Sequence, residues 1–120
     1  MSIMSIIAGA IVAQAPVPAP DVAYWHLARG LNEAAIERIE ANGDLAADDP
    51  ARLINLGIAH AREGRADEAR ALFRAALRDA ESVRLETATG DWRDSRTLAR
   101  IALRMLDDGE FGSGVRLAAR

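Results

Sequence analysis

The sequence predicts an all-α fold in which helices pair into short antiparallel hairpins. Half of the 120 residues are hydrophobic, but aromatic residues make up only 4% and alanine supplies much of the apolar content. Such a composition favours closely packed helices with small residues at their contacts. Apolar residues also recur at helical spacing along the chain, and one stretch repeats itself at a distance of 34 residues, 64 − 30 = 34 between two glycines.

The first fifteen residues resemble a secretory signal peptide. The run from Ile3 to Ala13 is apolar and uncharged and ends in Ala13-Gln14-Ala15, a sequence of the kind that signal peptidases accept. It is too short for a membrane span, which takes about twenty apolar residues. A basic start is missing and Pro16 follows the expected cleavage point, so a simple helical N-terminus is the alternative. We expect export to a bacterial periplasm, and otherwise a cytoplasmic protein.

Residues 16–20 read PVPAP and separate this leader from the expected folded part. Alternating prolines remove backbone donors and hold the chain extended. We therefore expect a short stiff spacer here, followed by a helical domain over residues 21–108.

The repeat joins residues 22–43 to residues 56–77 without a gap. Gly30 falls on Gly64 and Ala35 on Ala69. A period of about 34 residues is typical of a unit made of a helix, a tight turn and an antiparallel helix. We expect two such units, over about residues 21–47 and 50–80, with the first helix of the first unit cut short by Pro20.

The second unit carries the clearer local signals. Asp49 is a good N-cap, and Pro50 suits the first helical position, where its missing N–H costs nothing. Gly64 suits the left-handed end of a helix. Gly57 and Ala69 stand on the facing stripes of the two helices, and small residues there allow the helices to cross at short range.

These residues resemble the tetratricopeptide-repeat family, whose spaced pattern is Trp/Leu, Leu, Gly, Tyr, a turn Gly, Ala, Phe/Tyr and Ala. The matching residues are Leu53, Leu56, Gly57, His60, Gly64, Ala69, Phe73 and Ala76. His60 replaces the tyrosine of the pattern, and its terminal proline is absent. The resemblance covers about residues 21–80 and implies a fragment of an α-solenoid with about two repeats.

The period is broken over residues 81–93. Val83, Leu85 and Thr87 alternate with polar residues, and residues 89–91 read Thr-Gly-Asp, which is turn chemistry. We expect a small hairpin or an ordered loop in which Trp92 packs on the helices. A functional loop that presents Trp92 is the alternative.

Asp94 or Ser95 is expected to cap a last helix over residues 94–108. One helical stripe of this segment is apolar: it consists of Leu98, Ile101, Ala102, Met105 and Leu106. Two helical hairpins leave one apolar face uncovered, and repeat proteins need a cap there. We expect this helix to be that cap, and residues 109–120 to be a flexible tail with Phe111 pinned to the fold.

Composition and charge exclude several classes of protein. The formal net charge is −3, the chain has no lysine, and its arginines are interleaved with acidic residues. Nucleic-acid binding relies on basic patches, so nucleic acid is not an expected partner. The chain has no cysteine, which excludes disulfides, thiolate metal sites and lipid attachment at an N-terminal cysteine.

The two histidines, His26 and His60, take equivalent places in the two repeats. Equivalent places in packed repeats lie roughly 10 Å apart, which is too far for two ligands of one metal ion. We expect each histidine to fill a position where the family has an aromatic residue, and no metal or cofactor is expected.

Catalytic pairs of carboxylates are not expected either. Glu33 with Glu37 and Asp107 with Asp108 are the closest approach to such pairs, and both are expected to be solvated. Motifs of metalloproteases, phosphate-binding loops and serine hydrolases are missing from the sequence. We therefore do not expect an enzyme.

In the family that the chain resembles, the first helices of successive repeats line a concave groove that holds a partner segment. The resemblance implies that the groove residues of the second repeat are Ala51, Ile54, Asn55, Ile58, Ala61 and Arg62. Asn55 and Arg62 can hydrogen-bond a backbone or a carboxylate, and the isoleucines offer apolar contact. The isoleucines and the absence of lysine depart from the grooves that clamp the C-terminal carboxylates of chaperones.

We therefore expect a protein–protein interaction module that acts as an adaptor or scaffold for an envelope protein. The alternative is a structural role without a separate ligand. Two repeats are marginal alone, so Ile54 and Ile58 would then be covered by the C-terminal helix or by a second copy of the chain in a homodimer.

Overall fold

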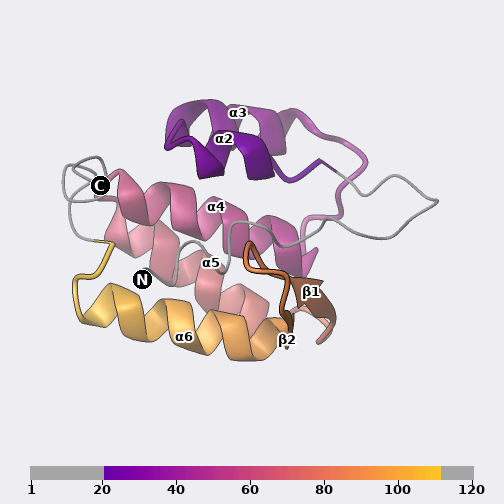
Figure 1. Cartoon of the computed structure of the whole chain (residues 1–120), viewed down its shortest axis with the longest axis vertical. Helices are drawn as coiled ribbons and strands as arrows, with labels where there is room; N and C mark the ends of the chain where they lie inside the picture. The colour runs from indigo at the N-terminus through magenta and orange to yellow at the C-terminus, as the bar shows by residue number, and fades with distance from the viewer. Residues whose placement is uncertain (1–20, 112–120) are drawn as a thin grey trace.

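The computed structural model describes residues 21–111, and over this range the chain is mostly helical (Figure 1). The elements in chain order are α2 (Tyr24–Ala28), α3 (Asn32–Ala41), α4 (Pro50–Arg62), α5 (Ala66–Arg78), β1 (Arg84–Glu86), β2 (Trp92–Asp94) and α6 (Ser95–Asp107). The expectation of a helical fold is confirmed to this extent. The expected leader, the spacer and the tail beyond Phe111 lie outside the described residues. Within residues 21–111, no helix has the length and apolar character needed to cross a membrane.

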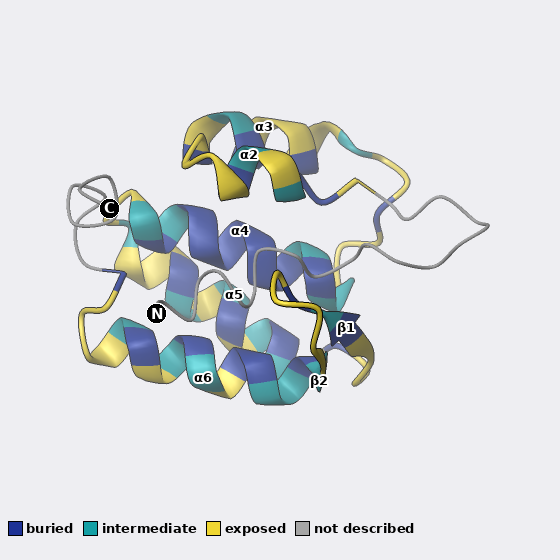
Figure 2. Cartoon of the chain, in the orientation of Figure 1, coloured by how far each residue is buried: buried dark blue, intermediate teal, exposed yellow. Residues whose placement is uncertain are grey.

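Helix α4 lies at the centre of the fold, and Figure 2 shows it as the most deeply buried helix. The pair α2 and α3 packs on one side of α4, α5 packs along it, and α6 packs on α5 and α4 (Figure 1). The core contains several large side chains that are fully buried, among them Ile54, Ile58 and Phe73. Burial of such apolar surface supplies most of the driving force for folding.

The helices α4 and α6 begin in the same way. Asp49 accepts a hydrogen bond from the backbone N–H of Arg52 at 3.0 Å, and Asp94 accepts one from the backbone N–H of Thr97 at 3.1 Å. Both carboxylates are therefore N-caps, and each satisfies one of the donors that a helix start leaves open. The predicted caps are confirmed, with Asp94 rather than Ser95 as the cap of α6.

Three helices end in the same left-handed turn. Gly30, Gly64 and Gly109 have φ angles of 75°, 80° and 69°. In each turn the N–H after the glycine donates to the carbonyl five residues earlier, at 2.8 Å after α2, 2.9 Å after α4 and 2.9 Å after α6. This is the Schellman arrangement, which glycine adopts without the steric cost of a side chain.

Helices α4 and α6 are therefore alike at both ends. The caps are 45 residues apart (94 − 49 = 45), and so are the turn glycines (109 − 64 = 45). The same distance places Leu98 on Leu53 and Ala102 on Gly57. This spacing is eleven residues longer than the period of 34 between Gly30 and Gly64, since 45 − 34 = 11.

Gly57 lies at a close approach between α4 and α5, where the side chain of Phe73 is its nearest neighbour. A Cβ atom built on Gly57 would lie 2.4 Å from Cε1 of Phe73, inside the ring's van der Waals surface. The ring of Phe73 thus fills the space above Gly57, which the sequence did not indicate, and the expected contact with Ala69 stays a prediction. Ala69 and Phe73 are both fully buried.

Helix α2 starts late and is only one and a half turns long. The N–H of Ala23 donates to Oδ1 of Asp21 at 2.8 Å, and Ala23 has φ 61° and ψ 35°. This left-handed conformation is uncommon for a residue with a Cβ atom and costs free energy. The chain therefore enters α2 through a tight, strained turn.

Residues 81–93 contain an antiparallel hairpin in which β1 pairs with β2. Leu85 faces Arg93 and Glu86 faces Trp92 in the register. Leu85 is buried, whereas Trp92 is 39% exposed. The expectation that Trp92 packs on the helices is therefore corrected, since Leu85 is the residue that anchors the hairpin to the core.

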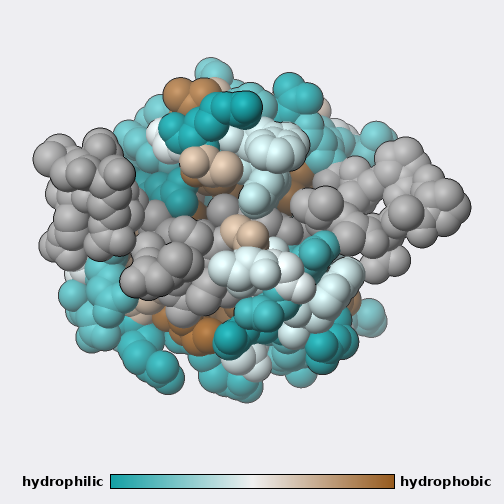
Figure 3. Space-filling view, viewed as in Figure 1, coloured by the Kyte–Doolittle hydropathy of each residue, from teal (hydrophilic) through white to brown (hydrophobic). Residues whose placement is uncertain are grey.

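The chain after α6 returns to the core at Phe111. This side chain is 2% exposed, and its ring stacks on that of Phe73 with 5.9 Å between the centroids. The expectation that Phe111 is pinned is confirmed. On the face shown in Figure 3, the described hydrophobic residues form small areas separated by hydrophilic ones.

Candidate functional site

The six residues predicted to line a groove lie on the most buried helix. Ala51, Ile54, Asn55, Ile58 and Ala61 are all buried, with exposed fractions between 0% and 4%, and Arg62 is half-buried. In this structure they do not line an open groove, which corrects the expectation of a surface ready for a partner. The apolar four belong to the hydrophobic core.

The two polar residues of this set hold the chain's own N-terminal segment. Nδ2 of Asn55 donates to the backbone carbonyl of Val22 at 3.1 Å. Nη1 of Arg62 donates to the backbone carbonyl of Leu27 at 2.6 Å. The expectation was that Asn55 and Arg62 bind the backbone of another protein, and here they bind the backbone of α2 and of the residues before it.

Arg62 is also connected to the start of α3. Its Nη1 donates to Oδ1 of Asn32 at 3.3 Å, and Nδ2 of Asn32 donates to Oε2 of Glu63 at 2.8 Å. Burial lowers the pKa of Arg62 to about 10, so the guanidinium remains charged at neutral pH. A charge in this position is stable only because oxygen acceptors surround it.

One buried polar atom in this region has no partner. Oδ1 of Asn55 makes no hydrogen bond within the described structure, although Asn55 is 0% exposed. A buried acceptor without a donor costs about 1–3 kcal/mol. The side chain thus has room for one more hydrogen bond, to a donor that residues 21–111 do not supply.

Comparison with models of protein families, with curated proteins and with solved structures finds no match. Function therefore has to be inferred from the contacts that this chain makes.

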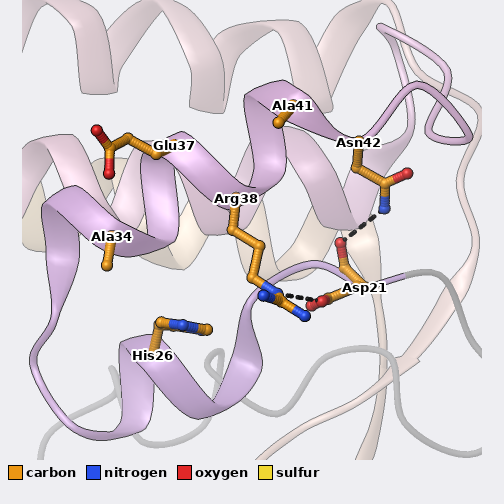
Figure 4. A pocket seen from close by; sticks show the side chains of 7 residues that line it. All are labelled: Asp21, His26, Ala34, Glu37, Arg38, Ala41 and Asn42. Atoms are coloured by element: carbon orange, nitrogen blue, oxygen red, sulfur yellow. Dashed lines mark hydrogen bonds and ion pairs between the residues drawn. The ribbon is translucent and has the colours of Figure 1, made fainter.

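A polar hollow of about 490 Å³ lies between the start of α2 and one face of α3. It is lined by Asp21, His26, Ala34, Glu37, Arg38, Ala41 and Asn42 (Figure 4). The Asp21 carboxylate faces the Arg38 guanidinium and forms an ion pair with it, and Asn42 donates to the Asp21 carbonyl at 3.1 Å. The contacts of Asp21 with Arg38 and Asn42 thus tie the start of α2 to α3.

The electrostatics of Asp21 argue against a role as a base. Burial raises the pKa of this carboxyl, but the hydrogen bond from the N–H of Ala23 and the contact with Arg38 outweigh that effect and leave the pKa below its ordinary value of 3.8. A carboxylate with a lowered pKa is a weak proton acceptor. The arrangement in Figure 4 is therefore better suited to holding α2 than to catalysis.

The histidines have different surroundings. Nδ1 of His60 accepts a hydrogen bond from Nε of Arg65 at 2.9 Å, while His26 lines the polar hollow. Among residues 21–111, there is no group of three or more histidine and acidic side chains that could hold a metal ion. Glu33 and Asp107, from the two carboxylate pairs, form exposed ion pairs with Arg65 and Arg70.

The surface of α2 carries the most exposed aromatic residue. Trp25 is 66% exposed, and Leu31 in the following turn is 51% exposed. The guanidinium carbon of Arg29 lies 5.7 Å from the centroid of the Trp25 ring, a cation–π contact. The outer side of α2 is therefore available to another molecule while its inner side is held by α4.

Sequence reasoning missed Asn32, Glu63 and Arg65, which connect the two helical pairs. Asn32 begins α3 and Glu63 ends α4, and Arg65 binds Glu33 at 3.1 and 3.2 Å. All three stand at helix ends or in the turn between α4 and α5, where polar residues are ordinary, so no pattern in the sequence marks them. The 45-residue distance between the caps of α4 and α6 is a signal that could have been found.

Proposed function

We propose that this chain is a protein–protein interaction module of tetratricopeptide-like architecture rather than an enzyme. The observation that carries the proposal is the use of Asn55 and Arg62 to hold main-chain carbonyls of a segment 33 and 35 residues away. Side-chain donors directed at carbonyl oxygens recognise a polypeptide backbone, whatever its side chains are. Such a face of α4 is suited to binding protein.

The repeat architecture is supported by the equivalent turns after α2, α4 and α6 and by the equivalent caps of α4 and α6. In this interpretation, α2–α3 and α4–α5 are two repeats and α6 is the first helix of a third, displaced by the hairpin. The helices α2, α4 and α6 then correspond to the row of first helices that lines the groove in tetratricopeptide repeats.

We further propose that the protein acts in the cell envelope, on the basis of the leader-like residues 1–15. The mass of the chain isolated from its native host tests this part. A chain that begins after residue 13 or 15 would support export, and a chain that retains Met1 would contradict it.

Crosslinking in the native host tests the interaction. The full chain carries a C-terminal tag, and the captured proteins are identified by mass spectrometry for wild type, Arg62→Ala and Arg100→Ala. Arg100 is an exposed arginine on α6 and provides the matched control. We expect one set of envelope proteins to be captured by wild type and Arg100→Ala and lost with Arg62→Ala. Capture that is equal for all three chains would contradict binding through this face.

Self-association is the second candidate, and the exposed Trp25 and Leu31 favour it. Exposed apolar side chains that lie together often mark contact surfaces. Sedimentation of the full chain over a wide concentration range distinguishes the two candidates. A mass that stays that of a monomer supports the interaction module, whereas a mass that rises with concentration and falls again in Trp25→Ser supports the homodimer.

A further inference from the structure

A segment of the chain itself occupies the inner face of α4. Side chains of α4 hold this segment through contacts of the kind that bind a peptide ligand. Val22 and Leu27 each present a backbone carbonyl to a side chain of α4, and the side chain of Leu27 is buried with 1% exposed. The segment Val22–Ala28 thus has two main-chain acceptors and three buried apolar side chains, Val22, Ala23 and Leu27, of which Leu27 is the largest and serves as the apolar anchor. We call it the internal ligand.

The internal ligand fits its place imperfectly. It enters through Ala23 in the left-handed conformation, with φ 61°, and its helix has five residues, too few to be stable by itself. Oδ1 of Asn55 is buried without a partner, and burial lowers the pKa of Arg62 to about 10. Each of these features reduces the free energy gained when the segment binds.

Separate contacts hold α3 in place without α2. The carboxylate of Glu33 binds Arg65, and Asn32 binds Glu63, so α3 has its own connections to the end of α4. Between α2 and α3 stands Gly30, with φ 75° and no atom within 4 Å of an added Cβ. The chain can therefore turn at Gly30 while α3 remains packed.

We propose that the internal ligand is displaced from α4 by a polypeptide segment of a partner protein. The incoming segment presents a main-chain carbonyl to Nδ2 of Asn55, a main-chain N–H to Oδ1 of the same side chain, a carbonyl to Arg62, and an apolar side chain in the place of Leu27. It gains the hydrogen bond that the internal ligand leaves unmade. This inference rests on the proposed function and adds the chemistry of the partner and the means of its regulation.

A peptide with the sequence of the internal ligand provides the test. The probe is a fluorescent, terminally blocked peptide of residues 21–30, DVAYWHLARG, and its anisotropy is measured with four forms of the full chain. These are wild type, Leu27→Asp, and Leu27→Asp combined with either Arg62→Ala or Arg100→Ala. Leu27→Asp removes the apolar anchor in the chain but leaves the probe unchanged.

We expect Leu27→Asp to bind the probe at least about tenfold more tightly than wild type, because an occupied face reduces the apparent affinity by the fraction of open molecules. The added Arg62→Ala should remove this gain, and the added Arg100→Ala should preserve it. Equal binding to wild type and Leu27→Asp, or binding that survives Arg62→Ala, would overturn the proposal.

Hydrogen exchange of the same chains shows whether α2 can detach from α4 while the other helices stay folded. In Leu27→Asp, the amides of α2 should lose protection while those of α4 and α5 retain it. Loss of protection throughout the chain would show that α2 belongs to the cooperative core, and would also overturn the proposal. Failure of the peptide test leaves the crosslinking result standing, because a partner that is captured by wild type and lost with Arg62→Ala would then bind beside the internal ligand instead of displacing it.

Discussion

Gly57 is a residue at which the two central helices pack closely. The ring of Phe73 occupies the space where any side chain at this position would begin, and the other face of the Phe73 environment is closed by the stacked Phe111. A fully buried ring has few ways to move aside. Close packing at this point therefore requires that residue 57 has no Cβ atom.

Gly57→Ala is expected to destabilise the fold. Alanine has the better helix propensity, but its Cβ would lie 2.4 Å from the Phe73 ring, and overpacking of this kind typically costs about 1–3 kcal/mol. Urea denaturation measures the free energy of unfolding. Gly43→Ala is the control, since no atom lies within 4 Å of a Cβ added there. An equal effect of the two substitutions would contradict the close contact.

Asp21 has a pH-dependent effect on the docking of α2. Its pKa in the folded chain is below 3.8, so its interactions stabilise the fold at pH values above this ordinary value, and the stabilisation is lost as the pH falls through the lowered pKa. Asp21→Asn should therefore reduce stability at neutral pH, by no more than about 1 kcal/mol because the ion pair is exposed.

Wild type and Asp21→Asn should converge in stability as the solution is acidified. Urea denaturation at a series of pH values measures this difference. Asp48→Asn, at an exposed aspartate, is the control and should follow wild type. A difference between wild type and Asp21→Asn that persists at acid pH would show that the carboxylate charge is not its cause.

At the scale of the elements, the ends of the helices show the most regular features of this fold. The turns after α2 and α4 have the same hydrogen bonds and the same glycine conformation, and neither glycine has a neighbour within 4 Å of an added Cβ. Substitution of either glycine therefore changes the backbone energy without disturbing the packing.

Gly30→Ala and Gly64→Ala are expected to destabilise the chain by similar amounts. An L-residue in the left-handed region costs about 1–2 kcal/mol, and both φ angles lie there, at 75° and 80°. Denaturation curves of the two variants test the equivalence of the turns. A neutral result at one position alone would show that the turn there relaxes into another conformation.

Asp94→Ala should destabilise α6 by about 1 kcal/mol, which is the usual effect of removing an N-cap carboxylate. Asp94 also accepts a hydrogen bond from the hydroxyl of Ser82, so the end of the hairpin should loosen with it. Hydrogen exchange of the first turn of α6 measures the effect. Asp108→Ala, at the C-cap of the same helix, should be neutral or slightly stabilising, because a carboxylate opposes the dipole there.

The whole molecule is organised around α4 and the ring of Phe73. One helical pair lies on one side of α4, α6 lies on the other, and Phe111 closes the space beside Phe73. Asn55 and Arg62 join α4 to the first pair through polar contacts. The first pair is therefore held to α4 by these polar contacts as well as by buried apolar residues of the common core, among them Val22, Leu27 and Ile39.

Phe111→Ala is expected to lower the stability of the whole chain by about 3–5 kcal/mol, as removal of a buried phenylalanine usually does. Phe111 is 2% exposed and stacked on Phe73, so its loss leaves a cavity beside the central ring. Thermal unfolding measures the change, and Phe111→Leu should cost less because it fills part of the space. A transition temperature unchanged in Phe111→Ala would contradict this role.

The sequence by itself determined those features that depend on neighbours along the chain. Asp49, Pro50 and Gly64 predicted the limits of α4, and the apolar stripe from Leu98 to Leu106 predicted α6, because caps, turns and helical periodicity are local properties. The spacing of 45 residues between the caps and between the turn glycines of α4 and α6 was also present in the sequence, but it differs from the period of 34 and was not recognised.

Only the tertiary structure decided which surfaces are exposed. The groove residues were predicted from the resemblance to tetratricopeptide repeats, and the sequence does not say that Val22 and Leu27 lie against Asn55 and Arg62. In the same way, local pattern did not decide whether Leu85 or Trp92 is buried, or that Phe73 covers Gly57. Such outcomes depend on contacts between segments far apart in the chain, and their energies belong to the packed fold as a whole.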